Sequence, residues 1–301
     1  MNLNKEERNG YVISEDMKKI WNIQLLCVKK VLDVCQKHNL HIWAEGGTLL
    51  GTIRHKGYIP WDDDIDLLMM REDYNKLLAI ASKEFEEPFF FQSAYSDKCY
   101  PRGHAQVRYN GTAAILPGDI NCKFNQSIFI DIFVCDRLPA NRFELSSKLF
   151  KSEFLRRLLF EKTYSRFNLN NPKSLLKKIL LFFIFCVIPF KKTFKIFDSV
   201  FDDIEEESGN VACVSFSMAS VFKPLKKKWF SKTLYMPFED IMMPVPVGYD
   251  EMLTTLYGDY MTPVKAPSLH GCVIFDTERP YTEVLKDIKS GKIDIKKYLN
   301  E

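Results

Sequence analysis

The spacing of apolar and polar residues predicts alternating helices and strands in the first hundred residues. Apolar residues recur at helical spacing over residues 14–37, and Ser14 can cap the start of that helix. We expect a short strand over residues 40–44, a second strand over residues 64–70 and a helix over residues 71–85. This alternation favours a sheet that is flanked by helices.

The pattern continues less regularly in the rest of the chain. Strands are expected over residues 104–110 and 126–134, and the second of these is rich in β-branched and aromatic side chains. Residues 141–205 read as helical, with many basic and apolar positions. Two further strand regions, 211–217 and 233–247, precede a helix that Gly258 ends.

One apolar run stands out inside the helical region. Residues 179–190, ILLFFIFCVIPF, are flanked on both sides by pairs of lysines. A bilayer crossing needs about 20 apolar residues, so this run is too short to span a membrane. Two interpretations remain open: a buried core helix, or a segment that lies on the inner leaflet of a membrane with its lysines against anionic head groups.

Composition narrows the class of protein. The chain has 301 residues, 46% of them hydrophobic, and a net charge of +3, which argues against bulk disorder and against a dedicated nucleic-acid binder. None of the eight cysteines forms a C-x-x-C pair, so buried free thiols are expected instead of a zinc site or a disulfide framework. Because the first ten residues are polar, we expect a cytoplasmic protein and no secretory signal.

The stretch WDDDID, residues 61–66, crowds four carboxylates into five positions. Asp64 and Asp66, two residues apart on a predicted strand, would point to the same face of the sheet. Asp131 interrupts the apolar strand SIFIDIFV, where a carboxylate is costly unless it is paired or metal-bound. We therefore expect the three to hold Mg²⁺ or Mn²⁺. The competing interpretation of WDDDID is a solvated acidic loop.

A glycine turn precedes the acids. Gly46, Gly47 and Thr48 lie between a predicted strand and a predicted helix, where glycines allow a phosphate to approach the backbone and the helix N-terminus favours an anion. The Thr48 hydroxyl can donate a further hydrogen bond. The residues that follow match neither a Walker A loop nor a dinucleotide-binding fingerprint, and a plain tight turn is the competing interpretation.

Three segments together resemble the LicD family of phosphotransferases, of which fukutin and its animal relatives are distant members. The first segment, AEGGTLLGTIRHKGYIPWDDDIDLLM, looks like the family's hallmark. IFIDIF is similar to its middle motif, and VPVGYDEMLTTLYGDYMTPV is similar to its closing motif. The segments occur in the family's order between residues 40 and 270, whereas residues 140–235 match only loosely.

The resemblance implies an α+β fold with a nucleotidyltransferase-type, polymerase-beta-like mixed sheet that is flanked by helices and carries an additional helical insertion. The expected organisation has four parts. They are a flexible tail (1–14), a nucleotidyltransferase-like catalytic core (15–140), a helical basic and apolar insertion (141–210), and C-terminal strands and a helix that complete the same domain (211–301).

The resemblance also implies a reaction. Family members transfer a phospho-alcohol, such as phosphocholine, from a CDP-activated donor to a sugar hydroxyl of a glycan. Mg²⁺ on Asp64 and Asp66 would bridge the diphosphate, and Asp131 would either complete the metal shell or accept the proton of the attacking hydroxyl. These two roles for Asp131 remain open. The acceptor would be a cell-surface glycan, lipid-linked in one alternative, and the enzyme would work in the cytoplasm or at the periphery of the membrane.

Basic residues are expected to hold the phosphates. Arg54 lies between the glycine turn and the acids. Arg102, His104 and Arg108 lie on or near a strand expected close to them, and Arg108 is the preferred candidate of these three. His270 follows the closing motif, where the family often carries histidine. A surface charge or loop histidine is the competing interpretation of each. We expect Trp61 to anchor the acidic loop or to stack on the nucleotide base, and Tyr257 to be a packing residue.

Two other functions remain open at this point. A metal-dependent glycosyltransferase also uses an Asp-x-Asp pair, on the diphosphate of a sugar nucleotide, but the glycine turn and Asp131 argue against it. The other alternative is a non-catalytic nucleotide-binding or scaffold protein of a surface-glycan assembly. The presence of all three expected acids counts against that alternative.

Overall fold

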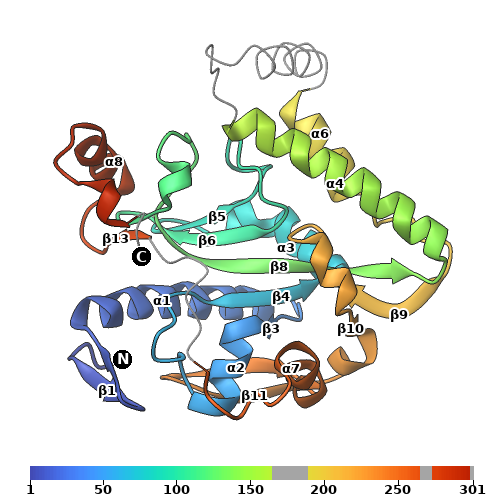
Figure 1. The fold of residues 1–301 in the computed structure, drawn as a ribbon, viewed down its shortest axis with the longest axis horizontal. Coiled ribbons are helices and arrows are strands. Elements are labelled where there is room, and N and C mark those ends of the chain that lie inside the picture. The colour runs from blue at the N-terminus through green and yellow to red at the C-terminus, as the bar shows by residue number, and fades with distance from the viewer. Residues whose placement is uncertain (165–188, 265–272, 299–301) are drawn as a thin grey trace.

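The computed structural model of the chain describes residues 1–164, 189–264 and 273–298. Its centre is a seven-stranded mixed sheet in which β10, β9, β8, β4 and β3 follow one another, while β6 pairs with β8 and β5 with β6 (Figure 1). The expected α+β class is confirmed at the level of a mixed sheet with helices. The strands of this sheet are β3 (Trp43–Ala44), β4 (Asp66–Met70), β5 (Phe89–Gln92), β6 (Ala105–Tyr109), β8 (Ile128–Pro139), β9 (Glu207–Ala212) and β10 (Leu225–Lys226).

Strand β8 organises the sheet because it is the longest strand and carries three partners. It pairs in parallel with β4, and antiparallel with β6 along its first half and with β9 along its second half. Nearly every β8 residue is buried, which fits the apolar sequence. The expected strand over residues 126–134 is therefore correct in place but continues to Pro139, because β9 extends the pairing.

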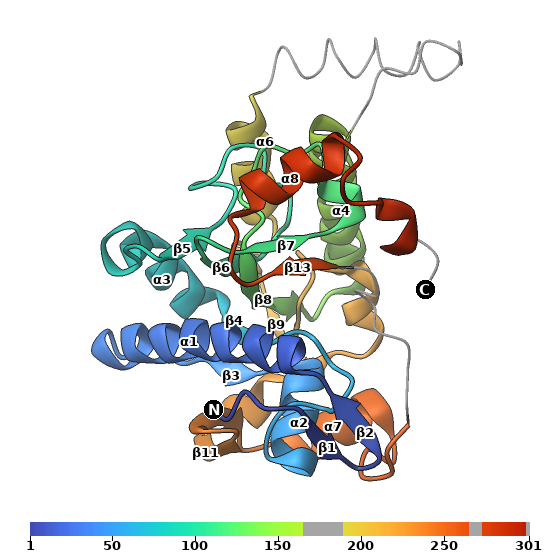
Figure 2. The same cartoon turned by 90° about the vertical axis from the view of Figure 1, so that its left-hand side faces the viewer.

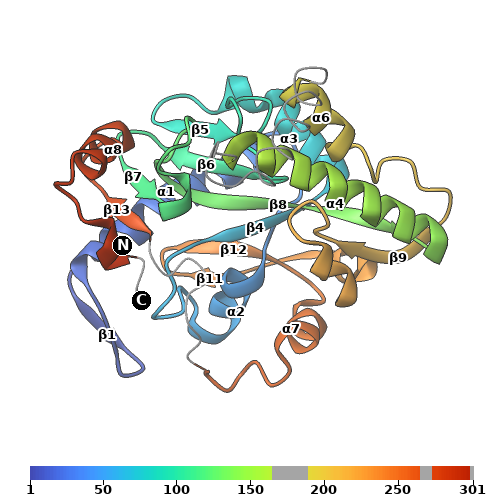
Figure 3. The same ribbon diagram turned by 45° about the horizontal axis from the view of Figure 1, so that its top comes forward.

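The helices cover this sheet. The helices around the sheet are α1 (Glu15–Lys37), α2 (Gly46–His55), α3 (Arg71–Glu84), α4 (Arg142–Tyr164), α6 (Phe190–Asp198) and α7 (Tyr249–Tyr257). α1 crosses the sheet against β6 and β8 (Figure 2), and Ser14 caps it by accepting a hydrogen bond from the Met17 N–H at 3.1 Å, as expected. α4 packs against α6 and against β8 (Figure 3).

Two smaller units flank the sheet. A hairpin of β11 (Thr233–Phe238) and β12 (Ile241–Pro246) packs on α2 and β3, with its turn in the PFED segment. β7 (Ala113–Ile115) pairs with β13 (Ile274–Asp276), and α8 (Tyr281–Lys289) covers them around a separate apolar cluster. The sequence pattern did not predict this second unit.

The expectation of a loose tail over residues 1–14 is wrong for most of its length. β1 (Glu6–Arg8) and β2 (Tyr11–Ile13) form a hairpin. Arg8 bonds both Glu239 carboxylate oxygens, and Glu6 pairs with Lys18 of α1. Ion pairs with residues far along the chain are invisible to a local pattern, which explains the error.

Strand β4 begins two residues later than expected, and only the last two residues of the apolar run are described. β4 begins at Asp66, so Asp64 lies in the preceding loop and not on the strand. Residues 179–188 of the apolar run lie outside the described residues. Among the helices that the structure describes, none is both long and apolar enough to cross a bilayer.

Candidate active site

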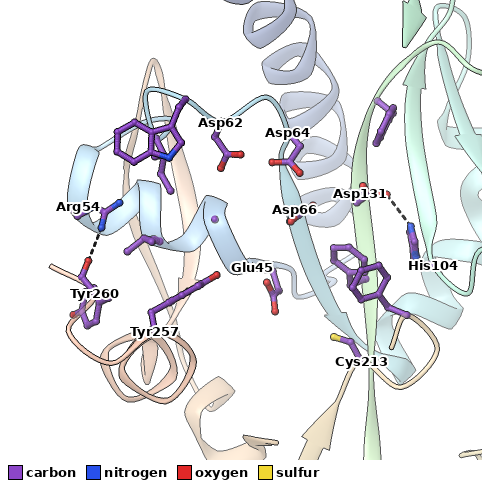
Figure 4. Close-up of a pocket in the computed structure, with 18 of the residues that line it drawn as sticks. Glu45, Arg54, Asp62, Asp64, Asp66, His104, Asp131, Cys213, Tyr257 and Tyr260 are labelled. Carbon is purple, nitrogen blue, oxygen red and sulfur yellow. Dashed lines mark hydrogen bonds and ion pairs between the residues drawn. The ribbon is translucent and has the colours of Figure 1, made fainter. Parts of the chain in front are cut away.

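A cavity of about 930 Å³ opens where the N-terminal end of α2, the loop before β4 and the strands β4, β6 and β8 meet (Figure 4). Six of the nine predicted site residues line it: Gly46, Gly47, Arg54, Asp64, Asp66 and Asp131. Acidic, aromatic and basic side chains from segments more than 200 residues apart also face this space. The fold thus gathers most of the predicted residues at one place.

Asp66 and Asp131 come together through strand pairing. They are direct partners in the parallel register of β4 and β8, and the Asp131 N–H donates to the Ile65 carbonyl at 2.9 Å. Neighbouring strands lie about 4.8 Å apart, and paired positions share a face of the sheet. The two carboxylates are therefore adjacent in the cavity wall.

The loop before β4 brings in further carboxylates. One carboxylate oxygen from each of Asp62, Asp63 and Asp64 lies within 4.8 Å of the other two. Among the described residues, these three are close enough together to ligate one metal ion. Two α1 side chains hold this loop: Trp21 Nε1 donates to the Asp62 carbonyl at 3.0 Å and Gln24 Nε2 donates to the Asp63 carbonyl at 2.7 Å. Asp64 thus reaches the site through a tethered loop and not through strand alternation.

The N-terminus of α2 closes against these acids. A Cβ atom on Gly47 would lie 2.7 Å from an Asp62 carboxylate oxygen, so a side chain does not fit there. Gly46 has a φ of +51°, in the left-handed region that favours glycine. The Thr48 hydroxyl is buried and accepts a hydrogen bond from the Asp66 N–H at 2.8 Å. Thr48 therefore ties α2 to β4 and does not line the cavity.

Burial and mutual repulsion disturb the acids of the cavity. Burial and the charge of Asp64 raise the pKa of Asp62 to about 8. Burial, together with the charges of Asp64 and Asp131, raises the pKa of Asp66 well above its usual range. Such shifts mark carboxylates without enough positive charge nearby. A divalent cation is the natural complement, and the hard oxygen donors fit Mg²⁺ or Mn²⁺.

Asp131 differs from its neighbours because it has protein partners. His104 Nε2 lies 3.0 Å from Asp131 Oδ1, and Gln106 Nε2 donates to the same oxygen at 2.8 Å. Burial alone would raise the pKa of Asp131, but the charge and hydrogen bonds of these partners outweigh burial and lower it. Asp131 is thereby held ionised in the cavity wall.

Arg108, which the sequence placed among the phosphate-binding residues, does not line the cavity. Its guanidinium is buried and donates to Gln92 Oε1 at 2.6 Å, to the Ser127 carbonyl and to Gln106 Oε1. Since Gln106 then donates to Asp131, Arg108 positions the carboxylate from behind. His270 lies outside the described residues.

Two arginines line the cavity with the acids. Arg54 donates to the Tyr260 carbonyl at 2.8 Å. Arg102, whose charge helps to lower the pKa of Asp131, pairs with Asp119 at 2.7 Å, and its Nη1 has no hydrogen-bond partner among the described residues. The sequence had named both Arg54 and Arg102 as candidates for holding phosphates, and both line the cavity.

Aromatic rings complete the walls. Trp61 and Tyr257 line the cavity on the α2 and α7 side, so Tyr257 is more than the packing residue expected from the sequence. Phe133 and Phe216 line the opposite side, with ring centroids 4.7 Å apart and both rings against His104. These surfaces suit a flat base or an organic cation.

Glu45 is a lining residue that the sequence reasoning missed. It caps the start of α2 through its backbone, and its carboxyl group faces the cavity (Figure 4). Burial raises the pKa of Glu45 to about 7. A signal was available, because an acid directly before the two glycines, at the end of an apolar strand, poses the same burial problem as Asp131.

Comparisons with known proteins agree with the resemblance described above. Residues 39–115 match a family model described as LicD/FKTN/FKRP, nucleotidyltransferase domain. The chain is 29% identical over 247 residues, 79% of its length and 89% of the relative, to the lipopolysaccharide cholinephosphotransferase LicD of Haemophilus influenzae. It is 46% identical over 43 residues, 14% of its length and 9% of the relative, to the ribitol 5-phosphate transferase FKRP of Mus musculus. The predicted resemblance to the LicD family is confirmed.

Proposed function

We propose that this chain is a metal-dependent phosphotransferase that moves a phospho-alcohol, phosphocholine or a similar group, from a CDP-activated donor to a sugar hydroxyl of a cell-surface glycan. The observation that carries the proposal is the convergence of Asp64, Asp66 and Asp131 beside the N-terminus of α2. The cholinephosphotransferase and ribitol 5-phosphate transferase named among the relatives support the same class of reaction.

We assign the metal site to Asp64, Asp66 and Asp131, with Asp62 as an additional ligand. The raised pKa values of Asp62 and Asp66 fit carboxylates that need a cation to ionise fully. When bound, Mg²⁺ or Mn²⁺ would neutralise the charge that develops on the transferred phosphoryl group and its leaving group.

In this proposal Asp131 is a metal ligand, and a different residue, Glu45, accepts the proton of the attacking hydroxyl. The lowered pKa of Asp131 suits a metal ligand and makes it a weak proton acceptor. Glu45, with a pKa near 7, is better matched to accept the proton of the attacking sugar hydroxyl. Glu45 is thus the candidate general base, and His104 with Gln106 keeps Asp131 in place.

The phosphate groups of the donor would lie in the cavity between the acids, the N-terminus of α2 and the two arginines. Backbone N–H groups at Gly46 and Gly47 begin α2, where an anion is favoured. Arg54 and Arg102 line the cavity and supply positive charge for the phosphates. Trp61 offers a ring on which the cytosine of a CDP donor can stack.

A ligand panel tests this function. Wild-type protein and Asp66→Asn are heated with CDP-choline, CDP-ethanolamine, CDP-ribitol, UDP-glucose or GDP-mannose, each with and without Mg²⁺. We expect metal-dependent stabilisation by one CDP-alcohol, its loss in Asp66→Asn, and release of CMP when a glycan acceptor is added. Asp240→Asn, a surface carboxylate outside the cavity, is the matched control.

The same panel separates the alternatives. Stabilisation by a sugar nucleotide alone would replace the proposal with a glycosyltransferase. Equal responses of wild type and Asp66→Asn to every nucleotide would favour a binding or scaffold protein.

A further inference from the structure

The solvent face of α4 carries a stripe of phenylalanines. Phe143, Phe150 and Phe154 are 84%, 76% and 56% exposed. Phe150 and Phe154 follow Phe143 by seven and eleven residues. Because successive residues of an α-helix are rotated by about 100°, the three side chains point within about 40° of one another. The three rings therefore form a single stripe. Phe160, six residues after Phe154, is turned about 120° away from it and contacts Tyr164 and Arg156.

Folding does not account for this stripe. The opposite face of α4 already supplies the core, where Leu155 and Leu159 pack with Phe194 and Phe197 of α6. A helix that buries one apolar face and exposes a second has a surplus of apolar surface. Contiguous exposed aromatic rings of this kind mark an interaction surface.

The polar residues around the stripe are basic. α4 is described over its whole length, and its exposed charged residues are Arg142, Lys151 and Arg157. Its carboxylates are partly buried and engaged: Glu153 binds Arg157 and its neighbour Arg156, and Glu144 pairs with Lys148. An anionic surface would thus meet rings and cations.

The neighbouring helix adds to this charge. α6 packs beside α4 and exposes Lys191, Lys192 and Lys195 (Figure 3). α4 contains six basic and three acidic residues, and α6 contains three basic and one acidic residue. The whole chain has a net charge of only +3, so positive charge is concentrated on this pair of helices.

An acidic turn limits the surface at one end. Asp203 and Glu205 line a groove of about 660 Å³ next to Phe143 and Lys148. Carboxylates there oppose contact with an anionic partner. The contact surface is therefore the part of α4 from Phe150 to Arg157.

We propose that this part of α4, with the lysines of α6, docks the protein on the surface of an anionic lipid membrane. The phenylalanines would enter the boundary between head groups and acyl chains, while Lys151, Arg157 and the α6 lysines contact lipid phosphates. A second copy of the chain is a poorer partner, because a symmetric contact through this face would bring equal charges together. The inference goes beyond the proposed reaction and does not rest on the donor or the metal.

Vesicle flotation of the full chain tests the proposal. We expect wild-type protein to float with vesicles of phosphatidylcholine and phosphatidylglycerol, and far less with phosphatidylcholine alone. The double variant Phe150→Ser with Phe154→Ser should weaken the partitioning into vesicles by at least about tenfold, because it removes two rings that the membrane would bury. Lys151→Glu should weaken it less and make it less sensitive to salt. Tyr235→Ser, an exposed ring on β11 at the opposite side of the molecule, is the control.

Each other outcome overturns the inference. Unchanged flotation of the double serine variant would move any membrane contact to another segment, residues 179–190 included. Equal binding to neutral vesicles would remove the charge argument. A dimer of wild type that the variant loses, without flotation of either, would identify a second copy as the partner. If the wild type does not float and the double serine variant melts at a lower temperature, the phenylalanine stripe of α4 packs against another part of the same chain. CMP release from the CDP donor in the presence of a water-soluble acceptor should be equal in all these variants, which separates this proposal from the proposed reaction.

Discussion

Two buried carboxylates of the same strand belong to clusters of different composition. Asp136 of β8 receives two hydrogen bonds from Arg71, at 2.7 and 3.1 Å, and the same guanidinium also bonds Asp198 at 2.6 Å. Asp131, five residues earlier on β8, faces a cavity in which Asp62, Asp64 and Asp66 are its neighbours. Arg71 supplies a cation to the first cluster. In the second cluster His104 and Gln106 bond Asp131, but the pKa values of Asp62 and Asp66 stay raised because burial and neighbouring carboxylates oppose their charged forms.

The difference separates charges that serve the fold from charges that await a ligand. A buried ion pair with complete hydrogen bonding is internally satisfied, although its net stabilising effect is modest. Several carboxylates with raised pKa values around one space are destabilising until a cation arrives, and such clusters gather at functional sites. The comparison thus predicts opposite responses to similar substitutions at the two places.

The largest expected effect is on turnover and concerns the cavity carboxylates. Asp66→Asn should lower kcat/KM by about 10³-fold or more, because metal-assisted transfer loses a central ligand. The same variant should be as stable without metal as the wild type, or more stable, since it removes a repelled carboxylate. Steady-state CMP release and urea unfolding measure the two effects. A large loss of stability in Asp66→Asn would mean that Asp66 serves the fold and does not await a ligand.

The Arg71 cluster should respond in stability. Arg71→Met leaves Asp136 and Asp198 without their shared partner and should lower the free energy of unfolding by about 3–5 kcal/mol. Urea unfolding measures this loss. Lys76→Met, which removes only an exposed pair with Asp73, is the control and should unfold like the wild type. Equal unfolding of both variants would contradict the assignment of Arg71 to the fold.

Mg²⁺ should stabilise the folded protein by binding at the cavity carboxylates and not at the Arg71 cluster. Mg²⁺ at one hundred times its dissociation constant should add about 2.7 kcal/mol to the free energy of unfolding of the wild type. Asp66→Asn should gain little from Mg²⁺, whereas Asp240→Asn should gain as much as the wild type. An equal gain in all three proteins would show that the ion acts elsewhere.

The pH dependence of turnover sharpens the role of Glu45. Its pKa of about 7 predicts that kcat/KM rises with pH through the neutral range, as the carboxyl loses its proton and becomes a base. Glu45→Gln should lower kcat/KM by about 10²-fold and remove that acidic limb. A profile that keeps the limb in the variant would assign the titration to another group.

The smallest effect concerns the hairpin of β1 and β2, whose charges are compensated but partly exposed. The Arg8 hydrogen bond, and then Lys18, lowers the pKa of Glu6 to about 2 despite its partial burial. A lowered folded-state pKa means that the stabilisation is complete above the unfolded value of 4.5 and is lost as the pH falls toward 2. Amide exchange of residues 6–13 should therefore accelerate over this range while the core stays protected. Arg8→Gln should show fast exchange already at pH 7.

The sequence determined much of this protein locally. Apolar periodicity located α1 with its Ser14 cap, α3 and the buried strand around Asp131. The residues that line the cavity, from the glycine turn to Asp64 and Asp66, were identifiable because burying a carboxylate or a left-handed backbone is costly without a reason.

Only the tertiary structure decided which partner each charge received. Arg108 and Arg54 were both expected near the acids, yet one is buried behind Gln106 and the other lines the cavity. Glu45, Arg102 and the docked hairpin owe their roles to contacts between segments far apart in the chain. Charge interactions act through space and depend on burial, so a linear pattern reveals that a charge needs a partner but not which segment the fold brings to it.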